Sequence, residues 1–301
     1  MCYGSAHCAH SALSAHFIIS NLQILLIALQ SNPNRSPATA WRRFRAVVAF
    51  AMMESMELEI CIDSVESAIA AAKGGADRVE LCAALSEGGI TPSAGLIRAV
   101  RAAAEIAVQV MIRPRGGDFV YSDSELDVMG RDIAEAKSLG ASGVVLGLLK
   151  ADGTVDCART RQLVAMARPM NVTFHRAFDT CRDKDRALEE IIAAGADRIL
   201  TSGGAADAMS GVATIARMHE RAAGRIRIMA CGGVSPGNVV ELARRTGVRD
   251  FHTSTDVKVE CPAEGDGVEF DFHRATFTRW VVREEDVRAL KAALEEAATK
   301  V

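Results

Sequence analysis

The chain has 301 residues and a net charge of -3, with 49% hydrophobic and only 5% aromatic residues. Acidic and basic side chains are interspersed, without the basic stripe typical of nucleic-acid-binding proteins, so a nucleic-acid partner is excluded. The eight cysteines form no CxxC pair, and a chain of this size does not need disulfides. Their pattern favours a reducing, intracellular compartment.

Residues 1–55 form an extension with its own composition. Its first 53 residues contain no Asp or Glu but include four arginines between residues 35 and 45, as in organelle transit peptides. The alternative is that translation begins at a methionine between residues 52 and 56. The apolar stretch 17–29 is too short and too polar to span a membrane. We expect a disordered or targeting extension, no membrane association, and a cytoplasmic protein unless the extension directs it to an organelle.

Residues 56–301 are about as long as one α/β barrel, which has roughly 250 residues. One short sequence motif, a glycine followed by an apolar run, occurs four times. It begins at Gly75, Gly140, Gly195 and Gly247. Each glycine can end a helix in the left-handed conformation, and each apolar run has the length of a buried strand. The copies lie 65, 55 and 52 residues apart, which fits two strand–helix units each. The repeat therefore predicts a single (β/α)8 TIM-like barrel.

The predicted elements follow in chain order. The eight strands are Leu58–Ile62, Arg78–Cys82, Ala107–Arg113, Gly143–Leu149, Asn171–Arg176, Arg198–Thr201, Arg227–Cys231 and Phe251–Ser254. Helices fill the gaps between them, among them 65–73 and 123–139, and a last helix at 284–297 closes the ring. The segment 255–282 interrupts the repeat and is interpreted as an insertion that forms either a lid or variable surface.

Because side chains alternate along a strand, the apolar side of each strand must face the helices and the other side the barrel interior. This parity predicts an interior that is polar and rich in sulfur. Cys61, Cys82 and Met111 would come from three consecutive strands, and thiolate and thioether ligands select Cu(I). The alternative is that these side chains only fill space, since unpaired cysteine and methionine are common in cores.

A second group of predicted site residues is charged and maps to strand ends or to the loops beyond them. The group comprises Glu80, Arg113, Arg115, His175, Arg176, Asp179 and His252. Arginine forks suit a carboxylate or phosphate, which makes Arg113 and Arg115 candidate anion clamps, and Glu80 and His175 are candidates for general acid–base catalysis. The alternative is a network of ion pairs that holds this end of the barrel together.

Several longer motifs resemble the CutC family of copper homeostasis proteins. They are Glu80-Leu-Cys82, Glu87-Gly-Gly-Ile-Thr-Pro-Ser93, Arg113-Pro-Arg-Gly-Gly-Asp-Phe-Val-Tyr-Ser-Asp123, Thr173-Phe-His-Arg-Ala-Phe-Asp179 and Leu200-Thr-Ser-Gly-Gly204. The resemblance implies an α/β barrel, a cytoplasmic location in bacteria, assembly as a homodimer or larger homo-oligomer, and a role in copper handling. It also implies that Cys61 and Cys82 stand where the family carries the cysteines proposed to bind Cu(I).

The sequence thus supports two functional hypotheses. The first is an intracellular copper homeostasis protein that binds Cu(I) through Cys61 and Cys82, with Met111 as a third ligand. The second is an enzyme that acts on a small anionic metabolite at the carboxyl ends of the barrel strands, although no reaction can be assigned. The first hypothesis does not account for the charged motifs around Arg113 and His175.

Overall fold

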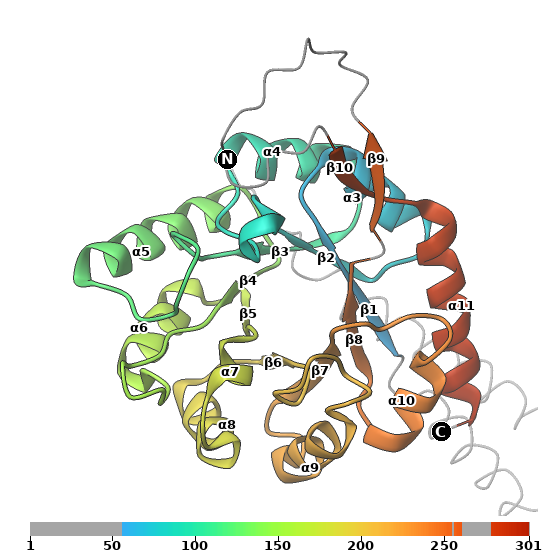
Figure 1. Ribbon diagram of the computed structural model, residues 1–301. Coiled ribbons are helices and arrows are strands. Elements are labelled where there is room, and N and C mark those ends of the chain that lie inside the picture. Colours follow the sequence, from blue (N-terminus) through green and yellow to red (C-terminus); the bar gives the residue numbers. More distant parts are fainter. Residues whose placement is uncertain (1–55, 255, 261–277, 301) are drawn as a thin grey trace, which may run out of the picture. The chain divides into compact units, whose positions relative to one another are not determined.

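The computed structural model describes residues 56–254, 256–260 and 278–300. Within this part of the chain, eight parallel strands close into a barrel in which every strand pairs with its neighbours in chain order and β1 pairs with β8 (Figure 1). The (β/α)8 barrel predicted from the glycine repeat is confirmed.

The strands are short and lie close to their predicted positions. They are β1 (Glu57–Ile62), β2 (Arg78–Leu81), β3 (Ala107–Met111), β4 (Gly143–Leu146), β5 (Asn171–Phe174), β6 (Arg198–Thr201), β7 (Arg227–Cys231) and β8 (Asp250–Thr253). Five of them, β2, β3, β4, β5 and β8, end one to three residues earlier than predicted, because the chain leaves the ladder for loops at the carboxyl end of the barrel. The freed residues after β3 and β5 include Arg113 and His175, which are both buried.

Helices surround the barrel (Figure 1). The longer ones are α3 (Val65–Lys73), α4 (Ala94–Ala103), α5 (Asp123–Ser138), α6 (Cys157–Ala167), α8 (Lys184–Ala194), α9 (Val212–Ala222), α10 (Val239–Thr246) and α11 (Glu284–Lys300). Two short elements, η1 (Leu85–Glu87) and α7 (Ala177–Thr180), follow β2 and β5.

The repeated glycines have the backbone conformation that the sequence requires of them. Gly75, Gly140, Gly195 and Gly247 all have positive φ, between 73° and 89°. An L-residue with a side chain rarely adopts this conformation, whereas glycine does so without steric cost. The glycines therefore turn the chain from each helix into the next strand, which is the physical origin of the repeat.

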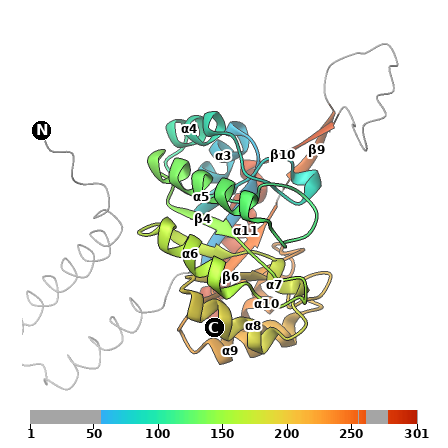
Figure 2. The same cartoon turned by 90° about the vertical axis from the view of Figure 1, so that its left-hand side faces the viewer.

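The segment after β8 contains two strands that the sequence analysis did not predict. Strands β9 (Asp256–Glu260) and β10 (Thr278–Val282) pair in antiparallel register as a separate two-stranded sheet. Figure 2 shows them extending beyond one end of the barrel. Most of the predicted insertion 255–282 lies outside the described residues, so its interpretation as a lid stays a prediction. Among the described helices, none combines the length and apolar character needed to cross a bilayer.

Apolar side chains separate the barrel from its helices, and polar ones occupy its interior. The outward-facing residues of β1, Leu58, Ile60 and Ile62, are almost completely buried in one large apolar core beneath the helices. Cys82 and Met111 belong instead to a small separate cluster inside the barrel, with Cys61 packed against it. The predicted parity of β1, β2 and β3 is therefore confirmed.

An inner ion network fills the amino end of the barrel. It consists of three arginines and three carboxylates, namely Arg78, Arg198, Arg227, Glu57, Glu59 and Asp250. Arg78 is central, because it donates to Glu59 at 2.7 Å and to Asp250 at 2.9 Å, and also pairs with Glu57. Equal numbers of opposite charges allow these groups to remain ionised away from solvent.

Substituting Arg78 with methionine should destabilise the barrel, because Glu59 and Asp250 would each lose a partner inside it. We expect the free energy of unfolding to fall by about 3–5 kcal/mol, as for other broken buried ion pairs. Urea denaturation measures the change. Arg131→Met is the control, because Arg131 is exposed on α5 and pairs only with Asp127, and it should leave the midpoint unchanged. Equal stability of Arg78→Met and wild type would contradict the structural role of the network.

Candidate functional site

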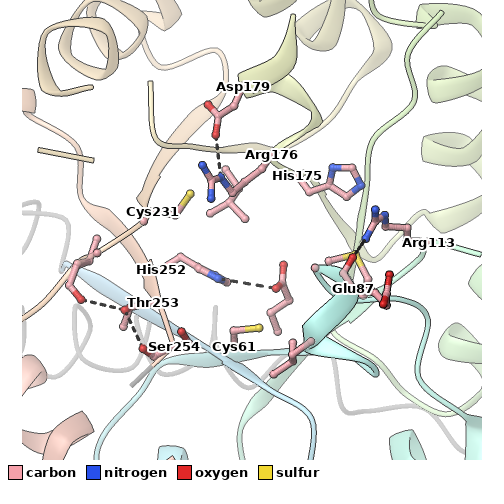
Figure 3. Close-up of a pocket in the computed structure, with 18 of the residues that line it drawn as sticks. Cys61, Glu87, Arg113, His175, Arg176, Asp179, Cys231, His252, Thr253 and Ser254 are labelled. Carbon is pink, nitrogen blue, oxygen red and sulfur yellow. Dashed lines mark hydrogen bonds and ion pairs between the residues drawn. The ribbon is translucent and has the colours of Figure 1, made fainter. Parts of the chain in front are cut away.

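A cavity of about 800 Å³ opens at the carboxyl ends of the barrel strands. Its walls include inward-facing residues of β1, β2, β3, β7 and β8 and the residues that follow β5 (Figure 3). The predicted residues Cys61, Glu80, Met111, Arg113, His175, Arg176, Asp179 and His252 all line it. Cys82 is completely buried directly behind this wall. Arg115, like Cys82, is a predicted site residue that is not among the residues lining the cavity.

Cys61, Cys82 and Met111 form a sulfur cluster on one wall. The two Sγ atoms and a carboxylate oxygen of Glu80 all lie within 4.8 Å of one another. Met111 packs in the same cluster, and its Cε and the Cys82 Sγ both lie near Gly89. A Cβ atom added to Gly89 would lie 3.0 Å from Cys82 Sγ and 3.7 Å from Met111 Cε. The strand register thus brings three soft donors together, as the sequence predicted.

The two thiols of the sulfur cluster differ in acidity. A hydrogen bond with Cys82 is the main cause that lowers the pKa of Cys61 to about 6, and His252 adds to it through a hydrogen bond and its positive charge. The pKa of Cys82 is raised well above its usual value by the same contact with Cys61 and by burial. Cys82 donates to Glu80 Oε2 at 3.6 Å. At neutral pH the cluster therefore presents one thiolate and one thiol.

His252 connects the cavity to the inner ion network. Its Nδ1 lies 2.8 Å from Glu59 Oε1, and its Nε2 lies 3.9 Å from Glu80 Oε2. Burial would lower the pKa of His252, but hydrogen bonds with Cys61 and Glu59 and the negative charge of Glu59 raise it well above its usual value. Burial also opposes ionisation of Glu59, yet the charge of Arg78 and the contact with His252 lower the pKa of Glu59 to about 2. His252 and Glu59 thus form an ion pair.

Glu80 is the neutral member of this group. It is 3% exposed, and burial, followed by the charges of Cys61 and Glu59, raises its pKa well above the usual value for a carboxyl group, although His252 acts in the opposite direction. Its Oε1 has no hydrogen-bond partner among the described residues. A buried, protonated carboxylic acid in a cavity wall can donate a proton or a hydrogen bond, which suits the acid role predicted for it.

His175 is held rigidly beside the cavity. Its Nδ1 accepts a hydrogen bond of 3.1 Å from the backbone N–H of Ala177, so the ring proton resides on Nε2. The ring packs at 4.9 Å from that of Phe119. Gly147, just after β4, leaves room for it, because a Cβ there would lie 2.5 Å from His175 Cε1. Burial, aided by the charge of Arg113, lowers the pKa of His175 to about 3. The imidazole is therefore a neutral N–H donor at physiological pH.

Arg113 binds main-chain carbonyl groups. Its guanidinium donates to the carbonyl oxygens of Glu87 at 2.8 Å, Gly89 at 2.9 Å and Gly117 at 2.9 Å, and lies over the Phe119 ring. These bonds hold the loops after β2 and β3 against each other. Its Nε has no partner, and no carboxylate of the described residues lies within ion-pair distance.

The other predicted anion clamp, Arg115, and the predicted ligand-binding residues Arg176 and Asp179 are mostly occupied by protein groups. Arg115 pairs with Glu125 at 2.6 Å and with Asp118 at 3.0 Å. Arg176 donates to Asp179 at 2.9 Å, and Asp179 also accepts from Ser202 and from the backbone N–H of Gly204. Asp179 therefore anchors the loop after β6.

Sequence reasoning did not assign three residues that shape the site. Glu59 was inward-facing by parity, but its link to His252 depends on the register between β1 and β8, which places the two residues directly opposite each other. Phe119 lies in an irregular loop, where no periodic pattern indicates its contact with His175. The role of Gly147 depends on the close approach of the His175 ring, which the sequence does not show.

Comparison with known proteins agrees with the fold and with these motifs. The chain matches the CutC family over residues 56–257. It belongs to the CutC family. A CutC family protein of Chromobacterium violaceum is 49% identical over 249 residues, which cover 80% of this chain and 98% of that protein. The human copper homeostasis protein cutC homolog is 49% identical over 197 residues, covering 65% of this chain and 72% of the human protein.

A solved structure shares the same barrel. The CutC crystal structure from Streptococcus agalactiae superposes with a TM-score of 0.63 at 34% sequence identity, covering 66% of this chain and 98% of that one. The CutC family resemblance of the motifs is thereby confirmed at the level of sequence and of fold.

The pKa of His175 predicts a specific pH dependence of stability. Above pH 6.5 His175 is neutral in both the native and the unfolded protein, so it contributes nothing to the pH dependence of the free energy of unfolding. As the pH falls below that value the unfolded histidine binds a proton while the native one, with a pKa of about 3, does not. Stability is therefore lost as the pH falls from about 6.5 toward 3, and at pH 5 the loss is about 2 kcal/mol.

Urea denaturation of wild type and His175→Gln at pH 7 and pH 5 measures this effect. Glutamine does not titrate, so the variant should lose about 2 kcal/mol less than wild type between the two pH values. His219→Gln is the comparison: burial and the charge of Arg249 also lower the pKa of His219, but this residue is exposed on α9, so its removal should change the pH dependence less than removal of His175 does. Identical pH dependence of wild type and His175→Gln would show that His175 is not held in its neutral form.

Proposed function

We propose that this protein acts in copper homeostasis by binding Cu(I) at the sulfur cluster, with Cys61 and Cys82 as the principal ligands and Met111 as the third. The observation that carries the proposal is the approach of both Sγ atoms to within 4.8 Å of each other, one from Cys61 on β1 and the other from Cys82, which directly follows β2. The name of the human relative, a copper homeostasis protein, agrees with it.

The donor chemistry of the cluster favours a soft cation. Thiolate and thioether sulfur select Cu(I), whereas hard cations require several oxygen ligands. The thiolate is the metal-binding form of cysteine, and Cys61, with a pKa of about 6, is already in that form at neutral pH. Cys82, whose pKa is raised by Cys61 and by burial, would lose its proton when the metal binds.

The position of the cluster suits reversible binding. Cys61 is partly accessible and lines the cavity, whereas Cys82 is fully buried behind it. An ion could thus enter through the carboxyl end of the barrel and be held against an apolar backing of Val145 and Leu85. Such a dry backing excludes water from the sulfur atoms.

An anaerobic Cu(I) titration of the reduced full-length protein against a competing chelator tests the proposal. Cys2, Cys8 and Cys261 lie outside the described residues and are replaced by serine in every protein compared. We expect one Cu(I) per chain, lost in Cys61→Ser/Cys82→Ser because both principal ligands are removed, and weakened in Met111→Leu.

The matched control is Cys157→Ser/Cys181→Ser, which removes the same number of thiols at sites away from the cavity. It should bind Cu(I) as wild type does. Unchanged Cu(I) affinity in Cys61→Ser/Cys82→Ser, or equal losses in the two double variants, would rule out the sulfur cluster as the copper site.

A further inference from the structure

We propose that the cavity also contains a second site, which binds the oxyanion group of a small organic metabolite through Arg113 and His175. Figure 3 shows these two side chains next to each other on one side of the cavity. They come from the ends of β3 and β5, and the sulfur cluster is formed by β1, β2 and β3. The proposal accounts for the charged residues that copper binding leaves unexplained.

The first argument is the charge of Arg113. Its side chain is buried, being 5% exposed, and its hydrogen bonds go to neutral carbonyl oxygens. Buried charges in proteins are normally paired, because removing an ion from water carries a large free-energy cost. No carboxylate among the described residues pairs with it. An anionic ligand in the cavity would supply the missing countercharge.

The second argument is the pair of unused donors. The Nε–H of Arg113 and the Nε2–H of His175 are both buried and have no hydrogen-bond partner within the described chain. Both side chains line the cavity and both pack on Phe119. Buried polar groups usually find a partner, so two adjacent orphan donors indicate an acceptor that belongs there. A carboxylate or phosphate group has several oxygens that accept such bonds.

The third argument is how firmly His175 is held. The Ala177 N–H fixes its tautomer and the space at Gly147 accommodates its ring. A neutral imidazole with a defined N–H is a directional donor that an acceptor oxygen can use without a change in protonation. Holding a donor in place before the ligand arrives reduces the entropy cost of binding.

The carboxyl groups that line the cavity do not compete for these donors. Asp179 is occupied by Arg176 and by the loop after β6. Glu80 contacts the sulfur cluster and His252 instead, with its Oε2 lying 3.6 Å from Cys82 Sγ and 3.9 Å from His252 Nε2. Glu87 is exposed, and its contact with Arg113 is through its backbone carbonyl. The positive charge of Arg113 therefore remains available to a ligand.

The size of the cavity fits a metabolite. Its volume of about 800 Å³ falls within the range of pockets that hold small organic ligands. Across from Arg113 the wall is formed by Gly232 and Gly233, with positive φ of 91° and 67°, and by Ser235. These small residues leave space for the remainder of the molecule beyond the oxyanion.

Calorimetric titration with inorganic phosphate and with malonate, at constant ionic strength, tests this site in the reduced, metal-free full-length protein. We expect one-to-one binding of at least one of them, and affinity at least about tenfold weaker in His175→Ala, which removes a buried donor. Malonate binding alone would identify a carboxylate ligand, and phosphate binding alone a phosphate ester. His219→Ala is the matched control and should bind as wild type does.

A second readout covers the case of variants that fail to fold. In protein labelled with ¹⁵N-histidine, the His175 side-chain signals should show the Nε2–H tautomer and should shift when the anion is added, whereas the His219 signals should not. Arg113→Met should abolish the shift. Failure of both anions to bind at millimolar concentration, or His175→Ala binding as tightly as wild type, would overturn the proposal.

The test is independent of copper. Cys61→Ser/Cys82→Ser should retain anion binding, because neither cysteine contacts Arg113 or His175 through a hydrogen bond. Loss of Cu(I) binding with retained anion binding in this variant would support both sites. If the wild-type protein binds the anion but no Cu(I), only the copper proposal fails.

Discussion

The contact between Arg78 and the carboxylates inside the barrel is the interaction on which the rest of the structure depends. Its guanidinium binds Glu59 and Asp250, which project from β1 and β8, the two strands that close the ring. The inner ion network thereby fills the amino end of the barrel with balanced charges, where most barrels use apolar layers. Because that end is filled, the interior is open only toward the carboxyl ends of the strands.

Glu59 connects the inner ion network to the cavity. One of its oxygens binds Arg78 and the other binds His252, so the carboxylate belongs to both the network and the cavity wall. The charge of His252 in turn contributes to the low pKa of Cys61. The acidity of a thiol near the opening of the barrel is thus linked through two residues to an arginine at its base. Such chains of buried polar groups are stable only when each member is satisfied.

The cavity has two walls of different chemistry. The sulfur cluster is soft and largely apolar, with a single thiolate, and its neighbour Glu80 is uncharged. The neighbouring part of the wall, beyond the ends of β3 and β5, presents the guanidinium of Arg113 and the neutral donor of His175. The sulfur cluster favours a soft cation, because a thiolate binds such ions. The surface formed by Arg113 and His175 favours an oxyanion, because a buried guanidinium attracts negative charge. The proposed anion site uses the unpartnered donors of Arg113 and His175, and the proposed copper site uses the two thiol groups.

The amino-acid sequence by itself determined the barrel, the strand order and the inward face of most strands, because glycine spacing and side-chain alternation depend only on local geometry. It also brought Cys61, Cys82 and Met111 together, since neighbouring strands of known parity leave little freedom.

Only the tertiary structure decided which charges pair. Arg115 pairs with Glu125, Asp179 binds the loop after β6, and His252 pairs with Glu59, whereas no carboxylate of the described residues pairs with Arg113. Long side chains at loop ends can reach several partners, and the choice among them depends on distances that strand periodicity does not specify. The hairpin of β9 and β10 was missed for the same reason, because its strands pair across residues 261–277 rather than through a local turn.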